Sequence, residues 1–229
     1  MSRFIIVTQE KGGVGKTFLS VHLTSYLRKL GHTYRPVDFD VQAGLVSRIF
    51  PSPDSANLNP DASLISSGES RFPELMERVL KGQQFLVDCG ANTGKAWDTL
   101  LNQAWPSLLD ELAEAGVKIT LIVPVASDEK SCPMFEHYKT MFPGATQIMV
   151  IVREFKDEQF QIPSHPKELT IELPLAPEKL FSSYRKKGLT IDQIATSADP
   201  ELAFVRGFAR GYLPQLHATF DRIKPHLLP

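Results

Sequence analysis

The sequence has few cysteines and no long apolar run, and we expect no secretory leader; each of these features excludes a class of protein. Two cysteines, Cys89 and Cys132, are too few and too isolated for a disulfide framework or a cysteine-rich metal site, which favours a reducing compartment. The longest apolar stretches, such as residues 119–126, are far shorter than the roughly 20 residues that span a bilayer. We therefore expect a cytoplasmic protein.

An excess of charge of one sign is also lacking. The chain carries 25 Lys and Arg against 26 Asp and Glu, so any contact with nucleic acid or an anionic membrane must come from a local patch. Apolar residues, in contrast, are plentiful: 42% of the 229 residues are hydrophobic, enough for a sizeable core. We expect one domain over residues 1–229.

Short apolar runs alternate with helical patterns along the chain. Such runs are typical of strands buried on both faces of a parallel sheet, and they lie at 4–7, 85–88, 119–125 and 148–152. Leucines recur at helical spacing over 16–30 and 97–115, each followed by a glycine. The alternation predicts an α/β fold: a doubly wound, mostly parallel sheet with helices on both faces and a ligand site at the carboxyl ends of the strands.

Two polar segments interrupt this alternation. Residues 50–70 are rich in Pro, Ser and Asn, and residues 153–169 are polar. Both compositions predict surface loops.

Residues 8–18, TQEKGGVGKTF, are similar to a phosphate-binding loop without its usual first glycine. The pattern G-x-x-x-x-G-K-[ST] would place glycine where this chain has Glu10. A glycine-rich turn between a strand and a helix directs backbone N–H groups and the positive helix end at one small volume, which suits a di- or triphosphate. Lys16 can reach the β- and γ-phosphates, and the Thr17 hydroxyl can ligate Mg²⁺. The predicted nucleotide-binding residues are Gly12, Gly13, Val14, Gly15, Lys16, Thr17 and Phe18.

The segment KGGVGKT resembles the deviant Walker A motif of the ParA/MinD family of ATPases. In that family the position of Glu10 need not be glycine, and the lysine that matches Lys11 is the signature residue. The resemblance implies a P-loop NTPase fold, ATP and Mg²⁺ as cofactors, and a sandwich homodimer that forms on ATP binding. It also implies that Lys11 reaches the phosphates of the partner subunit, where it acts as an arginine finger does in other enzymes.

Two further segments are similar to motifs of this family. DFDVQAG, residues 38–44, resembles the D-x-D-P-Q switch element, with Val41 in place of the usual proline. Extended backbone places Asp38 and Asp40 on one side of the chain, and the resemblance implies that Asp40 orients the attacking water. FLVD resembles a Walker B strand that ends in Asp88. The implied catalytic residues are Lys11, Lys16 and Asp40, and the implied metal-binding residues are Thr17, Asp38 and Asp88.

The resemblance implies slow ATP hydrolysis that a partner protein stimulates, but it leaves the cargo open. The first class is a DNA-partition ATPase that binds DNA nonspecifically, associates with the nucleoid and responds to a ParB-like partner. A modest basic footprint fits this class, although a solvated helix face explains the same residues equally well. The candidate DNA-binding residues are Arg185, Lys186, Lys187, Arg206 and Arg210.

The second and third classes carry a membrane or protein cargo. A membrane-cycling ATPase of the MinD kind would need a C-terminal amphipathic helix, which is disfavoured because the tail contains few basic residues and is interrupted by Gly207, Gly211 and Pro214. The aromatic residues of the tail, Phe204, Phe208 and Tyr212, predict instead a face packed against the domain. The third class is an ATPase of plasmid conjugation or protein positioning that does not bind DNA directly. We expect no helix-turn-helix domain ahead of the loop, so specific operator recognition is not expected.

Overall fold

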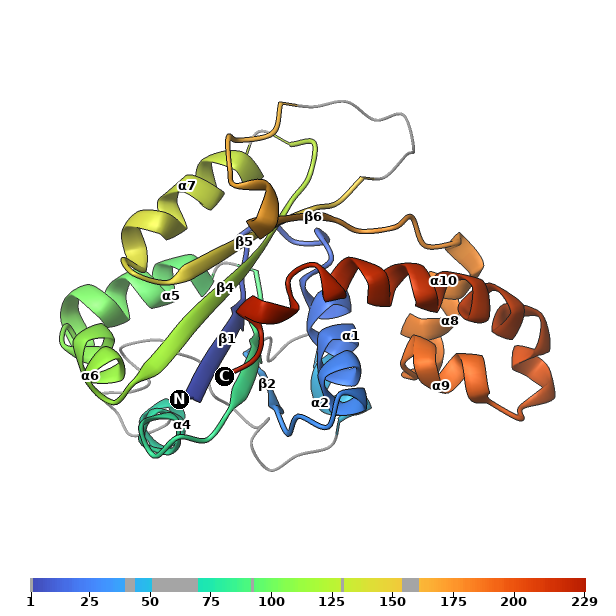
Figure 1. The fold of residues 1–229 in the computed structure, drawn as a ribbon, viewed down its shortest axis with the longest axis horizontal. Helices are drawn as coiled ribbons and strands as arrows, with labels where there is room; N and C mark the ends of the chain where they lie inside the picture. Colours follow the sequence, from blue (N-terminus) through green and yellow to red (C-terminus); the bar gives the residue numbers. More distant parts are fainter. Residues whose placement is uncertain (1, 40–43, 51–69, 92, 129, 154–160) are drawn as a thin grey trace.

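The computed structural model describes residues 2–39, 44–50, 70–91, 93–128, 130–153 and 161–229. Its centre is a six-stranded sheet in the order β2-β3-β1-β4-β5-β6, in which every pairing is parallel (Figure 1). The strands are β1 (Ser2–Val7), β2 (Arg35–Asp38), β3 (Phe85–Asp88), β4 (Val117–Val125), β5 (Thr146–Ile151) and β6 (Thr170–Glu172). The predicted parallel sheet is confirmed, and the four predicted strands lie within two residues of their expected positions.

Helices cover both faces of the sheet, because successive residues of each buried strand point to opposite sides. The helices are α1 (Lys16–Lys29), α2 (Leu45–Ile49), α4 (Phe72–Leu80), α5 (Thr93–Thr99), α6 (Leu108–Glu114), α7 (Ser131–Met141), α8 (Glu178–Lys187), α9 (Ile191–Thr196) and α10 (Ala203–Asp221). On β1, Ile5 and Val7 join a core with α1, α8, α9 and α10, whereas Phe4 and Ile6 join a core with α4 to α7. The doubly wound α/β fold is therefore confirmed.

The single helix predicted over 97–115 is wrong. α5 continues into a π-helical turn at Leu100–Ala104, the chain leaves helical geometry at Trp105, and α6 begins only at Leu108. Pro106 gives the physical reason, since proline lacks the N–H group that a helix needs and disfavours helical geometry in the residue before it. The leucine spacing continues across this break, so periodicity alone does not reveal it.

The last helix, α10, runs without a break through the three residues that were expected to interrupt it. Its buried stripe packs against the domain and outweighs the poor local propensities; the stripe is Val205, Ala209, Tyr212, Leu216 and Phe220. Phe204 and Phe208, however, are 63% and 37% exposed. Residues spaced four apart are each rotated by roughly 40° around the helix from the one before, so the three aromatic residues do not share the buried side. The predicted aromatic packing face is therefore right only for Tyr212. Within the described residues, no helix has the length and apolar character needed to cross a membrane.

A buried histidine joins α1 to α9. His22 is 1% exposed, its Nδ1 lies 2.7 Å from the carbonyl oxygen of Phe18, and its Nε2 accepts the N–H of Ile191 at 3.2 Å. The acceptor role of Nε2 places the proton on Nδ1 and requires a neutral ring. Burial is the main cause that lowers the pKa of His22 to about 4.

We expect His22 to make the protein less stable in mild acid. The unfolded chain takes up a proton near pH 6.5 and the folded protein only near pH 4, so stability is fully present above the higher value and is lost as the pH falls between the two. At about pH 5 the unfolding free energy should be lower by about 2 kcal/mol. Urea unfolding of His22→Gln should show correspondingly less pH dependence, with His137→Gln on the exposed side of α7 as the control. Equal pH dependence in His22→Gln and the parent would contradict this prediction.

Candidate functional site

The loop between β1 and α1 has the backbone shape of a phosphate-binding loop. Gly13 and Gly15 have φ angles of 79° and 90°, in the left-handed region that other residues disfavour. Gly15 is also the N-cap of α1 and has no side chain to bond the first N–H groups of the helix. These N–H groups and the positive helix end are therefore suited to an anion.

The two lysines of the loop point in different directions. Lys16 is 7% exposed and donates from Nζ to the carbonyl oxygen of Lys11 at 2.8 Å, so its ammonium group lies over the loop. The side chain of Lys11 instead forms an ion pair with Asp128, with 3.2 Å between Nζ and Oδ2. Lys11 thus lies against its own chain, and its action on a partner subunit stays a prediction.

Asp128 is a site residue that the sequence did not reveal. It follows β4, and its Oδ1 accepts the backbone N–H groups of Lys130 at 2.9 Å and Ser131 at 2.8 Å, at the start of α7. Burial raises the pKa of Asp128, but these bonds, the Ser131 hydroxyl and the Lys11 ammonium group outweigh it, so the pKa lies below its ordinary value. An aspartate just before a helical pattern indicates a helix start, but it does not indicate a partner for Lys11.

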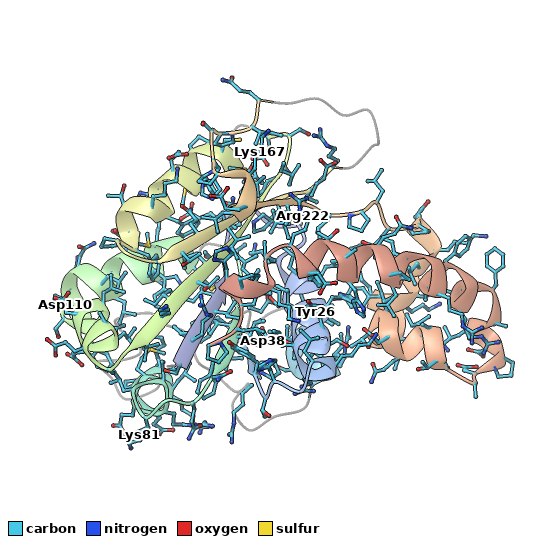
Figure 2. The ribbon with its side chains drawn as sticks, viewed as in Figure 1. Tyr26, Asp38, Lys81, Asp110, Lys167 and Arg222 are labelled. Carbon is cyan, nitrogen blue, oxygen red and sulfur yellow. The ribbon has the colours of Figure 1, made fainter. Side chains whose placement is uncertain are left out.

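Asp38 and Asp88 lie side by side at the carboxyl ends of β2 and β3. The sheet register pairs them directly, and they are 3% and 1% exposed. Oδ1 of Asp88 accepts the Ser20 hydroxyl at 2.8 Å, while its buried Oδ2 has no hydrogen-bond partner among the described residues. Asp38, labelled in Figure 2, accepts both the N–H and the hydroxyl of Ser47 and so connects β2 to α2.

The surroundings of Asp88 fit a divalent cation. The pKa of Asp88 is raised to about 7, chiefly by burial and further by the charge of Asp38. The hydroxyls of Ser20 and Thr17 and the charge of Lys16 lower the pKa, but by less. A cation would stabilise both carboxylates and satisfy the remaining Asp88 oxygen, and Mg²⁺ prefers oxygen ligands. The structure thus brings together the three residues predicted to bind the metal.

A cavity of about 410 Å³ lies against the loop. Its lining comes from the loop and the first residues of α1, from Leu45 and Arg48 of α2, and from Phe181, Tyr184 and Arg185 of α8. A larger cavity of about 590 Å³ lies beside the β4–α7 connection, but its described lining residues include no cation. The cavity at the loop is therefore the better site for a phosphate ligand.

The remaining predicted loop residues have structural surroundings that the sequence did not show. Val14 and Phe18 are buried, and the Phe18 ring centroid lies 5.8 Å from that of Phe181, so the loop end of α1 packs on α8. A Cβ on Gly94 would lie 2.5 Å from Oε1 of Glu10, so this glycine leaves room for the side chain that replaces the usual loop glycine. Asp40 lies outside the described residues, and its role stays a prediction.

Two of the candidate DNA-binding residues bond to backbone carbonyl groups. Arg206 donates from Nη1 to the carbonyl oxygen of Ser197, and Arg210 donates from Nε to that of Ala195 at 3.0 Å. Both arginines therefore join α10 to the end of α9. Their helical spacing is as predicted, but their guanidinium groups are partly engaged within the protein.

The basic run at the end of α8 is divided among three environments. Lys187 forms an ion pair with Glu201 at 2.5 Å, Lys186 is exposed, and Arg185 lines the cavity at the loop. All three residues of this run are exposed, and DNA binding stays a prediction.

Known proteins resemble this chain in sequence over part of its length and in fold over nearly all of it. Residues 5–199 match the family described as the CobQ/CobB/MinD/ParA nucleotide binding domain. A putative replication protein A from Rhizobium rhizogenes is 36% identical over 81 residues, which are 34% of this chain. The matched segment spans only 19% of that relative's own length.

The comparison with solved structures gives two MinD proteins, of which the first shares the arrangement of strands and helices. The septum site-determining protein MinD complexed with Mg-ADP from Pyrococcus horikoshii OT3 has a TM-score of 0.59 at 15% identity, over 98% of both chains. The MinD cell division protein of Aquifex aeolicus has a TM-score of 0.45 at 13% identity, over 93% of this chain and 98% of that one. At 15% identity, the similarity between this chain and the Pyrococcus horikoshii structure is a similarity of fold.

Proposed function

We propose that this chain, which belongs to the CobQ/CobB/MinD/ParA nucleotide-binding domain family, is an ATPase. In this proposal it is a single domain that works as an ATP-dependent homodimer. The observation that carries this proposal is the meeting of an anion-binding loop with a pair of buried carboxylates at one edge of the sheet. The MinD structure from Pyrococcus horikoshii contains Mg-ADP, which supports ATP and Mg²⁺ as the ligands of this chain.

In this proposal the loop N–H groups and Lys16 bind the β- and γ-phosphates, as the buried position of Lys16 over the loop allows. Thr17, Asp38 and Asp88 hold Mg²⁺, directly or through water. Held there, the cation would supply positive charge against the phosphate oxygens. Because Asp38 also bonds Ser47, occupation of the cation site can change the position of α2.

The catalytic step requires two further residues. Asp40, outside the described residues, orients the attacking water. Lys11 leaves Asp128 and contacts the phosphates of the partner's nucleotide when two subunits close. Hydrolysis is slow because the ion pair with Asp128 holds Lys11 within its own chain until the dimer forms.

We further propose that this dimer positions DNA and that a ParB-like partner protein stimulates its hydrolysis. The relative from Rhizobium rhizogenes is described as a replication protein, which supports a DNA cargo. A second candidate is the positioning of a protein or membrane cargo without direct DNA binding. The engagement of Arg206 and Arg210 with α9 and the exposed ring of Phe204 favour this second candidate.

One experiment separates these functions. The protein should hydrolyse ATP only with Mg²⁺, and with ATP it should shift duplex DNA of arbitrary sequence, less so as salt increases, because phosphate contacts release counterions. ADP is the control nucleotide, and anionic liposomes replace DNA in a parallel series. ATP hydrolysis without binding to DNA would favour the second candidate, and liposome binding would identify a membrane cargo. Absence of both ATP binding and hydrolysis would reject the ATPase itself.

A further inference from the structure

The cavity beside the loop holds more positive charge than the nucleotide motif explains. Its described lining residues include three cations, Lys16, Arg48 and Arg185, and no carboxylate. Lys16 belongs to the loop, and Lys11 points away to Asp128. The two arginines come from α2 and α8 and belong to neither the loop nor the carboxylate pair.

The arginines are held beside each other at the end of α8. Arg48 donates from Nη2 to the backbone carbonyl oxygen of Arg185 at 3.3 Å. Gly188, with a φ of 64°, follows α8, and a Cβ there would lie 3.5 Å from Nε of Arg48, so the arginine packs across this end of the helix. Among the described residues, no carboxylate forms an ion pair with Arg48 or Arg185, whereas the nearby Lys187 has two acidic partners.

Tyr184 lies next to Arg185 and lines the same cavity. It is 1% exposed, yet its hydroxyl group has no hydrogen-bond partner among the described residues. Burial raises the pKa of Tyr184, so the hydroxyl keeps its proton and can donate it to an acceptor. A buried hydroxyl without a partner destabilises a folded protein, which makes such groups uncommon unless a ligand completes them.

We infer that Arg48, Arg185 and the Tyr184 hydroxyl form a second phosphate-binding wall of the nucleotide site. This inference rests on the proposed ATPase function and adds residues to it. A polyphosphate offers an acceptor oxygen to the Tyr184 hydroxyl, and it offers the two arginines the negative charge that no carboxylate supplies to them within the described residues. α2 is bonded to Asp38 through Ser47 and α8 follows β6, the last strand, so this wall also connects the bound nucleotide to two elements outside the loop.

Calorimetric titrations of ATP and of inorganic tripolyphosphate test the wall. Arg48→Ala and Arg185→Ala should each weaken both ligands about tenfold, since each removes a charge-assisted contact. Lys186→Ala is the matched control: it removes the same charge from the next residue of α8, which is exposed and does not line the cavity. Arginine variants that bind ATP as tightly as this control would overturn the inference.

Tyr184→Phe separates a binding role from a packing role. It removes only the unpartnered hydroxyl, so urea unfolding should show equal or greater stability while the affinity for ATP falls several-fold. Unchanged affinity in this variant would remove Tyr184 from the wall.

The two ligands also distinguish failure of the wall from failure of the ATPase. If the parent binds tripolyphosphate through the arginines but does not bind ATP, the wall stands and the proposed function falls. If ATP binds and the arginine variants match Lys186→Ala, the function stands and the wall falls. A parent that binds neither ligand contradicts both.

Discussion

Replacement of Lys16 by alanine is expected to weaken ATP binding roughly a thousandfold. The ammonium group would make about two charge-assisted hydrogen bonds to phosphate oxygens, each contributing about 2 kcal/mol, and 1.4 kcal/mol corresponds to a factor of ten. The N–H groups of the loop remain in the variant, so some affinity is retained. Because Lys16 is 7% exposed and bonds the Lys11 carbonyl oxygen, its removal can also affect folding.

Calorimetric titration with ATP and Mg²⁺ measures this loss, and urea unfolding of the same sample shows whether the variant is folded. Lys118→Ala is the control, since it removes an exposed lysine at the opposite, amino-terminal end of β4. A folded Lys16→Ala protein with the affinity of the parent would show that the loop does not hold the phosphates.

Lys11→Ala is expected to keep its affinity for ATP but to lose about a thousandfold in kcat, the range known for a finger that stabilises phosphoryl transfer from a partner subunit. The ATP-dependent dimer should weaken as well, because the lysine joins the two subunits through the nucleotide. The side chain is 40% exposed and lies outside the cavity lining, so its removal should leave the loop intact. Equilibrium titration, steady-state hydrolysis and light scattering with ATP measure the three quantities.

Mixing the two lysine variants tests whether Lys11 acts across the dimer. A mixed dimer of Lys11→Ala and Lys16→Ala contains one subunit that binds ATP and one that supplies Lys11, so it should recover part of the activity that neither variant has alone. Without recovery, action on the partner's nucleotide is excluded. Asp128→Asn is the matched control, because an amide oxygen can still accept the N–H groups of Lys130 and Ser131 while the charge that holds Lys11 is gone. Its hydrolysis should exceed that of the parent, because the ion pair that holds Lys11 within its own chain is gone.

Much of the fold could be predicted because its signals are local. Continuous apolar runs marked four of the six strands, and a glycine-rich turn before an amphipathic helix marked the phosphate-binding loop. The family resemblance, drawn from KGGVGKT and the acidic strand ends, is confirmed by the match over residues 5–199. The errors were also local in origin. The leucine spacing continues across the break at Pro106, and the two glycines and the proline of α10 led to the expectation of an interrupted helix.

The candidate site was predictable only in part. Asp38 and Asp88 are 50 positions apart, and the family resemblance named both as metal-binding residues. The parallel register of β2 and β3 is what places them side by side. No comparable rule connects Lys11 to Asp128, or Arg48 to Arg185. Those contacts depend on which connection lies beside the loop and on how α8 packs against α1 and α2.

The sequence by itself determined the parallel sheet and the nucleotide-binding family, and it predicted the groups that would contact phosphate and cation, because each of these follows from the order of neighbouring residues. Only the tertiary structure decided where the charges lie. It placed Lys11 against Asp128, engaged Arg206 and Arg210 with the end of α9, and placed Arg185, a candidate DNA contact, in the lining of the cavity at the loop. The physical reason is that a charged side chain pairs with whatever the packed helices bring within reach, and residues far apart in the chain decide that.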